Sequence, residues 1–97
     1  MNPFFDEQGK RWVAAAERRG VSIEAPSLDS RIALELLELA RAAAHTQERR
    51  FAPLSCYLAG VAAERLRAEQ PGMEDAQIAA FIEEVRREVE GEPASER

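Results

Sequence analysis

Apolar residues return every three or four positions along four stretches of the chain, and this spacing constrains the fold more than any other feature. An α-helix has 3.6 residues per turn, so apolar side chains spaced in this way form one face of a helix. Strands need apolar and polar residues to alternate, and no segment here has that period. The sequence therefore predicts an all-α fold, a four-helix bundle or a closely related irregular helical fold.

The first predicted helix covers about residues 6–19 and stops at Gly20, because glycine readily takes the left-handed conformation that follows a helix. Phe5, Trp12 and Ala16 recur on one face of this helix, and at that spacing they are expected in the core. A connector that contains Pro26 leads to the second helix. That second helix is expected to begin at Asp29 or Ser30, either of which can cap it.

The second and third helices carry most of the predicted core. The apolar face of the second comprises Ile32, Leu34, Leu36, Leu37, Leu39, Ala40 and Ala43. Pro53 is suited to open the third helix, in which nearly every residue from 51 to 63 is apolar. Because a helix that is apolar nearly all round is usually buried, we predict that the third helix lies at the centre of the fold.

The fourth helix follows a break at Pro71 and Gly72 and ends at Gly91. Its apolar face comprises Ile78, Phe81, Ile82, Val85 and Val89, and charged residues are expected opposite. With no internal repeat and a length typical of one domain, residues 1–91 are predicted to form a single helical domain. Residues 92–97 are expected to be a disordered tail.

The chain offers little for catalysis or metal binding. A single cysteine, Cys56, and a single histidine, His45, exclude a disulfide framework and most zinc or iron sites. The sequence also lacks a glycine-rich phosphate loop and an acidic calcium loop. We therefore expect no metal, no cofactor and no enzymatic activity.

The net charge of −5 is unevenly distributed. Residues 1–50 hold eight basic and eight acidic side chains, whereas residues 51–97 hold five basic and ten acidic ones. Phosphate backbones repel an acidic protein unless its basic groups gather on one face, so nucleic-acid binding is not expected. No secretory signal and no run of about 20 apolar residues is found. We expect a soluble, cytoplasmic protein that does not span a membrane.

A pattern in the middle of the chain resembles a known family. It consists of Leu39-Ala40-Arg41, Ala44-His45, Glu48-Arg49 and Ala52-Pro53-Leu54. The pattern is similar to that of short, mainly actinobacterial proteins of unknown function, and the similarity extends over about residues 10–89. This chain departs from the family at Ala42, where an aspartate is common.

The resemblance implies a context but no established activity. Similar domains occur alone or attached to molybdenum-cofactor guanylyltransferase-like proteins. Such an association implies an accessory role near molybdenum-cofactor or formate-dehydrogenase maturation. It does not imply a catalytic residue at any position of this chain.

Arg41, His45 and Glu48 lie four and three residues apart, which places them on one face near the end of the second helix, and Arg49 follows them. The third helix starts nearby at Ala52, which has no side-chain oxygen to cap the free N–H groups of Leu54 and Ser55. Three interpretations remain open: Glu48 caps the third helix and His45 braces the turn, the face docks a partner, or the arginines and the helix start bind a phosphate or carboxylate.

The leading hypothesis is a non-catalytic accessory or protein-interaction module with a protein partner, and the sequence does not specify its oligomeric state. The alternative is a small-anion or nucleotide-binding protein that uses the Arg41, His45 and Arg49 face. Cys56 lies in the first turns of a helix, where a thiolate is stabilised, and His45 could act as its base. Because Cys56 falls within an apolar run, we interpret it as a small core residue instead.

Overall fold

The computed structural model describes residues 2–91, and within that range the chain forms four helices and no strand. The helices are α1 (Pro3–Glu17), α2 (Ser30–Thr46), α3 (Phe51–Glu69) and α4 (Asp75–Glu90). The predicted all-α class is therefore confirmed. The chain divides into two compact units, an N-terminal unit up to Ser30 and a C-terminal unit from Arg31. A single domain over 1–91 stays a prediction, and the predicted tail at 92–97 lies outside the described residues.

The ends of α1 are set by local hydrogen bonds. The helix begins at Pro3, earlier than predicted, because the Asn2 side chain accepts a hydrogen bond of 2.8 Å from the Phe4 N–H. At the other end Gly20 has φ +79°, and the Val21 N–H donates to the carbonyl of Ala16 at 3.0 Å. The predicted glycine stop is therefore confirmed, since this bond satisfies a carbonyl that the helix leaves open.

The aromatic stripe of α1 does not lie in a core, contrary to the prediction. Phe5 is 39% exposed and Trp12 is 56% exposed. Between them on the same helix face, Gly9 is buried, and a Cβ atom there would lie only 2.8 Å from the carbonyl oxygen of Pro26. The connector is thus a single chain that passes close to the helix at Gly9, and it is too narrow to cover both rings.

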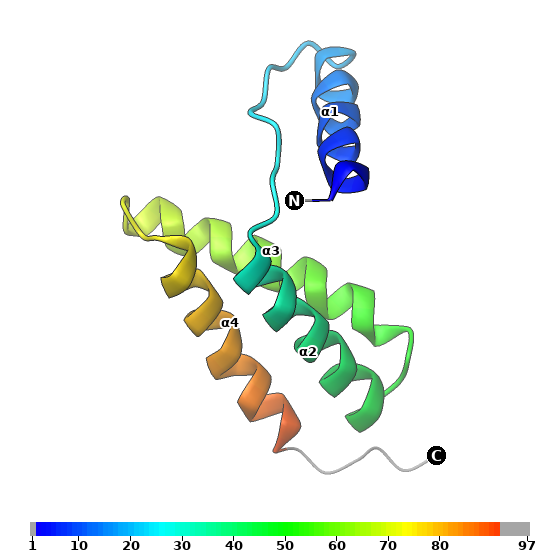
Figure 1. The fold of residues 1–97 in the computed structure, drawn as a ribbon, viewed down its shortest axis with the longest axis vertical. Coiled ribbons are helices and arrows are strands. Elements are labelled where there is room, and N and C mark those ends of the chain that lie inside the picture. Colours follow the sequence, from blue (N-terminus) through cyan, green and yellow to red (C-terminus); the bar gives the residue numbers. More distant parts are fainter. Residues whose placement is uncertain (1, 92–97) are drawn as a thin grey trace. The chain divides into compact units, whose positions relative to one another are not determined.

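In the C-terminal unit, α3 crosses behind α2 and α4 in the view of Figure 1, and side-chain contacts join all three helices. The Cys56 thiol reaches the carbonyl of Leu36, and the Glu35 carboxylate bonds Arg86. The core between the helices is small. Its buried members are Leu39, Ala63, Ile78 and Ile82, and partly buried side chains such as Leu36, Leu66 and Phe81 pack against them.

Two sequence predictions about this core are wrong. Leu34 and Leu37 of α2 are 58% and 66% exposed, so they do not widen its buried face. Helix α3 is not central, because Ala63 is its one buried residue in the described part of the chain. The physical reason is geometric: Ala59 and Ala63 allow close approach on the core side, where Leu66 also packs, and the large side chains of Leu54, Tyr57 and Leu58 fall elsewhere on the helix.

The start and end of α4 agree with the sequence. Gly72 has φ +93°, a conformation that glycine adopts without strain, and it follows the predicted break at Pro71. The Glu74 N–H then donates to the Gln77 side chain at 2.8 Å, which satisfies one free donor at the helix start. Gly91 ends the helix as predicted.

Candidate functional site

The predicted site residues begin on the solvent side of α2. Leu34, Leu37, Arg41 and His45 are all exposed, and they recur at intervals of three, four and four residues. We call these four residues the outer face of α2. Leu37 lies two positions from the buried Leu39, about 200° around the helix, so this face points away from the core. Two leucines therefore stand beside two of the predicted site residues on one exposed stripe.

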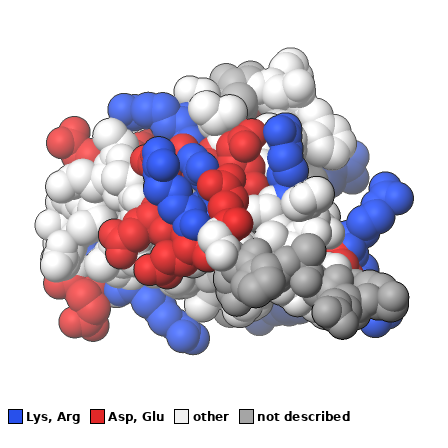
Figure 2. Space-filling view, turned by 90° about the horizontal axis from the view of Figure 1, so that it is seen from below, with Lys and Arg blue, Asp and Glu red and all other residues white. Residues whose placement is uncertain are grey.

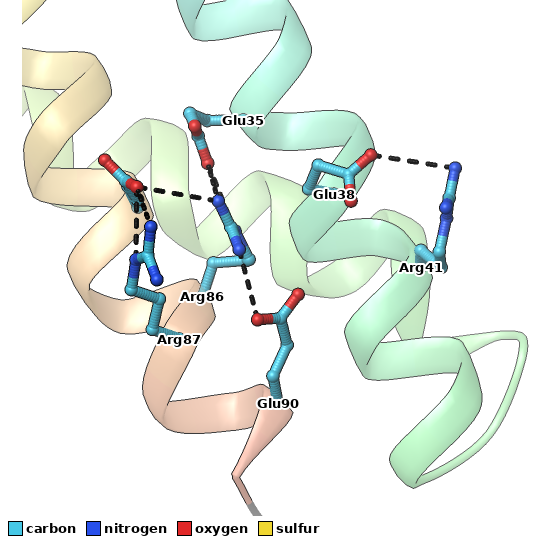
Figure 3. A network of polar contacts seen from close by, with 7 residues as sticks. Glu35, Glu38, Arg41, Arg86, Arg87 and Glu90 are labelled. Atoms are coloured by element: carbon cyan, nitrogen blue, oxygen red, sulfur yellow. Dashed lines mark hydrogen bonds and ion pairs between the residues drawn. The ribbon is translucent and has the colours of Figure 1, made fainter.

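Arg41, one of the basic members of the outer face, is only weakly engaged. The Arg41 guanidinium lies 3.6 Å from Glu38 one turn earlier, and its side chain is 75% exposed. Figure 3 shows this pair at the edge of α2, on the far side from α4. An exposed ion pair of this kind contributes about 0–1 kcal/mol, so the Arg41 side chain can exchange Glu38 for another acidic group at little cost.

Glu48 and Arg49, the other predicted site residues, lie in the turn between α2 and α3. Glu48 is half-buried and lies 2.6 Å from the Nε atom of Arg50, whereas Arg49 is exposed. The N–H groups of Phe51 and Ala52 donate to the carbonyls of Glu48 and Arg49 at 3.0 and 3.1 Å. Backbone carbonyls of the turn therefore satisfy the first two N–H donors of α3.

An open pocket of about 270 Å³ lies where the ends of α2 and α4 meet. It is lined by Arg41, Ala42, His45, Thr46 and Glu90. The Thr46 hydroxyl is buried and donates to the carbonyl of Ala42 at 2.8 Å. The pocket thus brings together Arg41 and His45 of the predicted set, without Glu48 or Arg49. Glu90 is the lining residue that sequence spacing missed, because it comes from another helix.

Beside this pocket, Arg86 of α4 is held between carboxylates of two helices (Figure 3). Its guanidinium donates to Glu35 of α2 at 3.1 and 3.2 Å and to Glu90 at 3.1 Å. The side chains of Arg86 and Glu35 are only 14% and 15% exposed. The hydrogen bond to Glu35 raises the pKa of Arg86, so the cation that joins α2 to α4 stays charged.

The neighbouring Arg87 faces solvent and bonds Glu83 at 2.6 Å. This hydrogen bond, together with the charge of Arg87, lowers the pKa of the Glu83 carboxyl group. Figure 2 shows acidic and basic side chains interleaved on the face of the molecule seen from below, with no broad basic surface among the described residues on that face. Opposite charges thus lie side by side on that face.

Comparison with known proteins identifies the family of this chain. A family described as domain of unknown function DUF6457 matches residues 6–97. The chain belongs to this family. No curated protein and no solved structure matches it. The expected resemblance to a family of unknown function is confirmed at that level.

The single cysteine of this DUF6457 chain is placed as a packing residue. Cys56 is half-buried, and its thiol donates to the carbonyl of Leu36 at 3.6 Å. Burial raises the pKa of the thiol, which keeps it protonated rather than as the thiolate that a nucleophile requires. This environment agrees with the interpretation of Cys56 as a small core residue.

The described residues of the DUF6457 chain form neither a metal-binding cluster nor a membrane-spanning helix. Between residues 2 and 91, no group of three or more histidine, cysteine, aspartate or glutamate side chains is arranged to hold a metal ion. In the same range no helix combines the length and the apolar character that crossing a membrane requires.

Proposed function

We propose that this chain is a non-catalytic accessory module that binds a protein partner through the outer face of α2. The observation that carries the proposal is the exposure of Leu34 and Leu37, one turn apart on a helix that also has a well-packed buried face. A helix with a core on one side gains no folding stability from large apolar groups on the other. Contiguous exposed apolar side chains of this kind are typical of interaction sites.

The rest of the outer face indicates what chemistry the partner offers. Arg41 and His45 extend the stripe beyond the two leucines, so one end of the face is apolar and the other is basic. A matching partner presents an apolar pocket or helix face for the leucines and a carboxylate near Arg41. The leucines would supply most of the affinity, since buried apolar anchors dominate interfaces and rim charges contribute less.

The resemblance drawn from the sequence makes molybdenum-cofactor guanylyltransferase-like proteins the first partners to examine. In a binding titration with a purified guanylyltransferase of this kind, we expect wild-type protein to bind and Leu37→Glu to bind at least tenfold more weakly. Leu58→Glu on α3 is the matched control, because it adds the same charge on another helix and should bind like wild type. Absence of binding by the wild type would reject this partner.

The general proposal has its own test, which does not depend on knowing the partner. A photo-crosslinking amino acid in place of Leu37 should give one defined adduct in cells, and the same group in place of the exposed Glu84 of α4 should not. Arg41→Glu should weaken the adduct at position 37. Equal crosslinking from both positions, or none from position 37, would contradict the proposed face.

The pocket favours one second candidate, a site for a small anion such as phosphate. Arg41 and His45 line the pocket and supply N–H donors, but Glu90 places a carboxylate in the same space. Phosphate added to the protein should raise its melting temperature by mass action if this site exists. His45→Ala should abolish that increase while leaving the melting temperature in phosphate-free buffer unchanged. No phosphate-dependent increase in the wild type would exclude the anion site.

A further inference from the structure

Helix α3 carries a second exposed apolar surface, on the side of the helix opposite to its contact with α2. Phe51, Leu54 and Leu58 are exposed and Val61 is half-buried; the four recur at intervals of three, four and three residues, and we call them the α3 stripe. Leu54 is 60% exposed and Leu58 is 67% exposed. Both are two positions from Cys56, whose thiol contacts α2, so they point about 200° away from that contact.

The stripe has charges of opposite sign at its two ends. Arg50 stands immediately before α3, and its side chain is 80% exposed although it pairs with Glu48. Glu69, the last residue of the helix, is also exposed. Arg50 thus lies at one end of the stripe and Glu69 at the other, with Arg65 one turn before Glu69. This arrangement matches a second copy of the same helix that runs in the opposite direction.

We propose that two copies of this chain associate through the α3 stripe, with their α3 helices antiparallel. In this register Arg50 of each copy meets Glu69 of the other, and Leu58 meets Val61 across the twofold axis. Leu54 then packs on the aliphatic part of Arg65 of the second copy. A twofold interface repeats every contact, so both charge pairs form together. A parallel pair would instead place Arg50 beside Arg50 and Glu69 beside Glu69.

The antiparallel arrangement also opposes the two helix dipoles, which brings the positive start of one α3 beside the negative end of the other. The interface consists of a single pair of helices, so we expect a reversible dimer with a dissociation constant in the micromolar range rather than an obligate one. This inference uses α3 and does not depend on the partner face proposed for α2.

The oligomeric state measured by sedimentation equilibrium over a range of concentrations tests the proposal. Wild-type protein should convert from monomer to dimer as the concentration rises, and Leu58→Glu should remain monomeric. Leu37→Glu, which adds the same charge on the outer face of α2, should dimerise like wild type. A wild type that is monomeric throughout, or a Leu58→Glu variant that still dimerises, would overturn the proposal.

A charge-reversal experiment tests the register even where Leu58→Glu fails to fold. Arg50→Glu and Glu69→Arg each place like charges at both ends of the homodimer, so each variant alone should dimerise at least tenfold more weakly than wild type. An equimolar mixture of the two restores opposite charges at both ends and should recover the wild-type affinity. A mixture that associates no better than its components would overturn the antiparallel pairing.

Discussion

Helices α3 and α4 are both rich in apolar residues, yet they use them in opposite ways. In α4 the large side chains of Ile78 and Ile82 are 1% and 4% exposed. In α3 the large side chains of Leu54, Tyr57 and Leu58 are between 60% and 72% exposed, and the core side carries two alanines and the partly buried Leu66. The difference shows that the placement of large side chains around a helix, rather than their number, decides whether the helix lies inside a core.

The largest effect predicted by this comparison is at Ile78, which packs fully inside the core. Ile78→Ala should lower the free energy of unfolding by about 2–5 kcal/mol, because it removes buried methyl groups and leaves a cavity. Urea unfolding followed by circular dichroism measures this loss. Val85→Ala, on the same helix at a position that is 43% exposed, is the control and should cost much less. Equal losses at both positions would remove the distinction between buried and exposed sides of α4.

A smaller effect is expected where α4 is joined to α2 by charge. Arg86→Met should lower the melting temperature, because it leaves the nearly buried carboxylate of Glu35 without the cation that it bonds. Arg87→Met changes the adjacent arginine, whose side chain is 67% exposed, and should have an effect several-fold smaller. Thermal unfolding of the two variants compares them directly, and a larger loss for Arg87→Met would contradict the assigned role of Arg86.

Much of the fold depends on interactions between residues that are close together in the chain, and these can be predicted from the sequence. The stop at Gly20, the break at Pro71 and Gly72, and the amphipathic α4 depend on residues close together in the chain, and all three are confirmed. The exposure of α3 depends on which neighbours cover it, which composition does not reveal. Its spacing placed Arg86 among the charged residues on the solvent side of α4. Its partner Glu35 lies 51 residues away in the chain, so local spacing does not predict the ion pair that they form.

The candidate site also combines residues that local spacing predicts with one that it does not. The i, i+4 spacing of Arg41 and His45 was enough to place them on one face of α2. Glu90 in the same pocket comes from α4, and the sequence offered no local signal for that approach. The sequence predicted Leu34 and Leu37 on the buried face of α2. On a helical wheel, however, Leu37 lies nearly opposite Leu39, and the angular positions of both residues place them outside that face.

A modest loss of folding stability is expected at acidic pH. The pKa of Glu83 is lowered in the folded state by Arg87, so its contribution to stability is present above its unfolded pKa of about 4.3 and is lost as the pH falls through the lower folded value. Stability should therefore decline below about pH 4. Glu83→Gln should reduce the steepness of that decline without changing its direction. An identical pH profile for wild type and variant would show that Glu83 does not contribute.

The smallest expected change tests the central claim most directly, namely that Leu54, Tyr57 and Leu58 of α3 lie outside the core. At concentrations low enough to keep the protein monomeric, Leu58→Ala should change the free energy of urea unfolding by no more than about 0.5 kcal/mol, as for other exposed positions. A loss of about 2–5 kcal/mol is what a buried leucine gives. Such a loss would show that Leu58 belongs to the core and would contradict the account of α3.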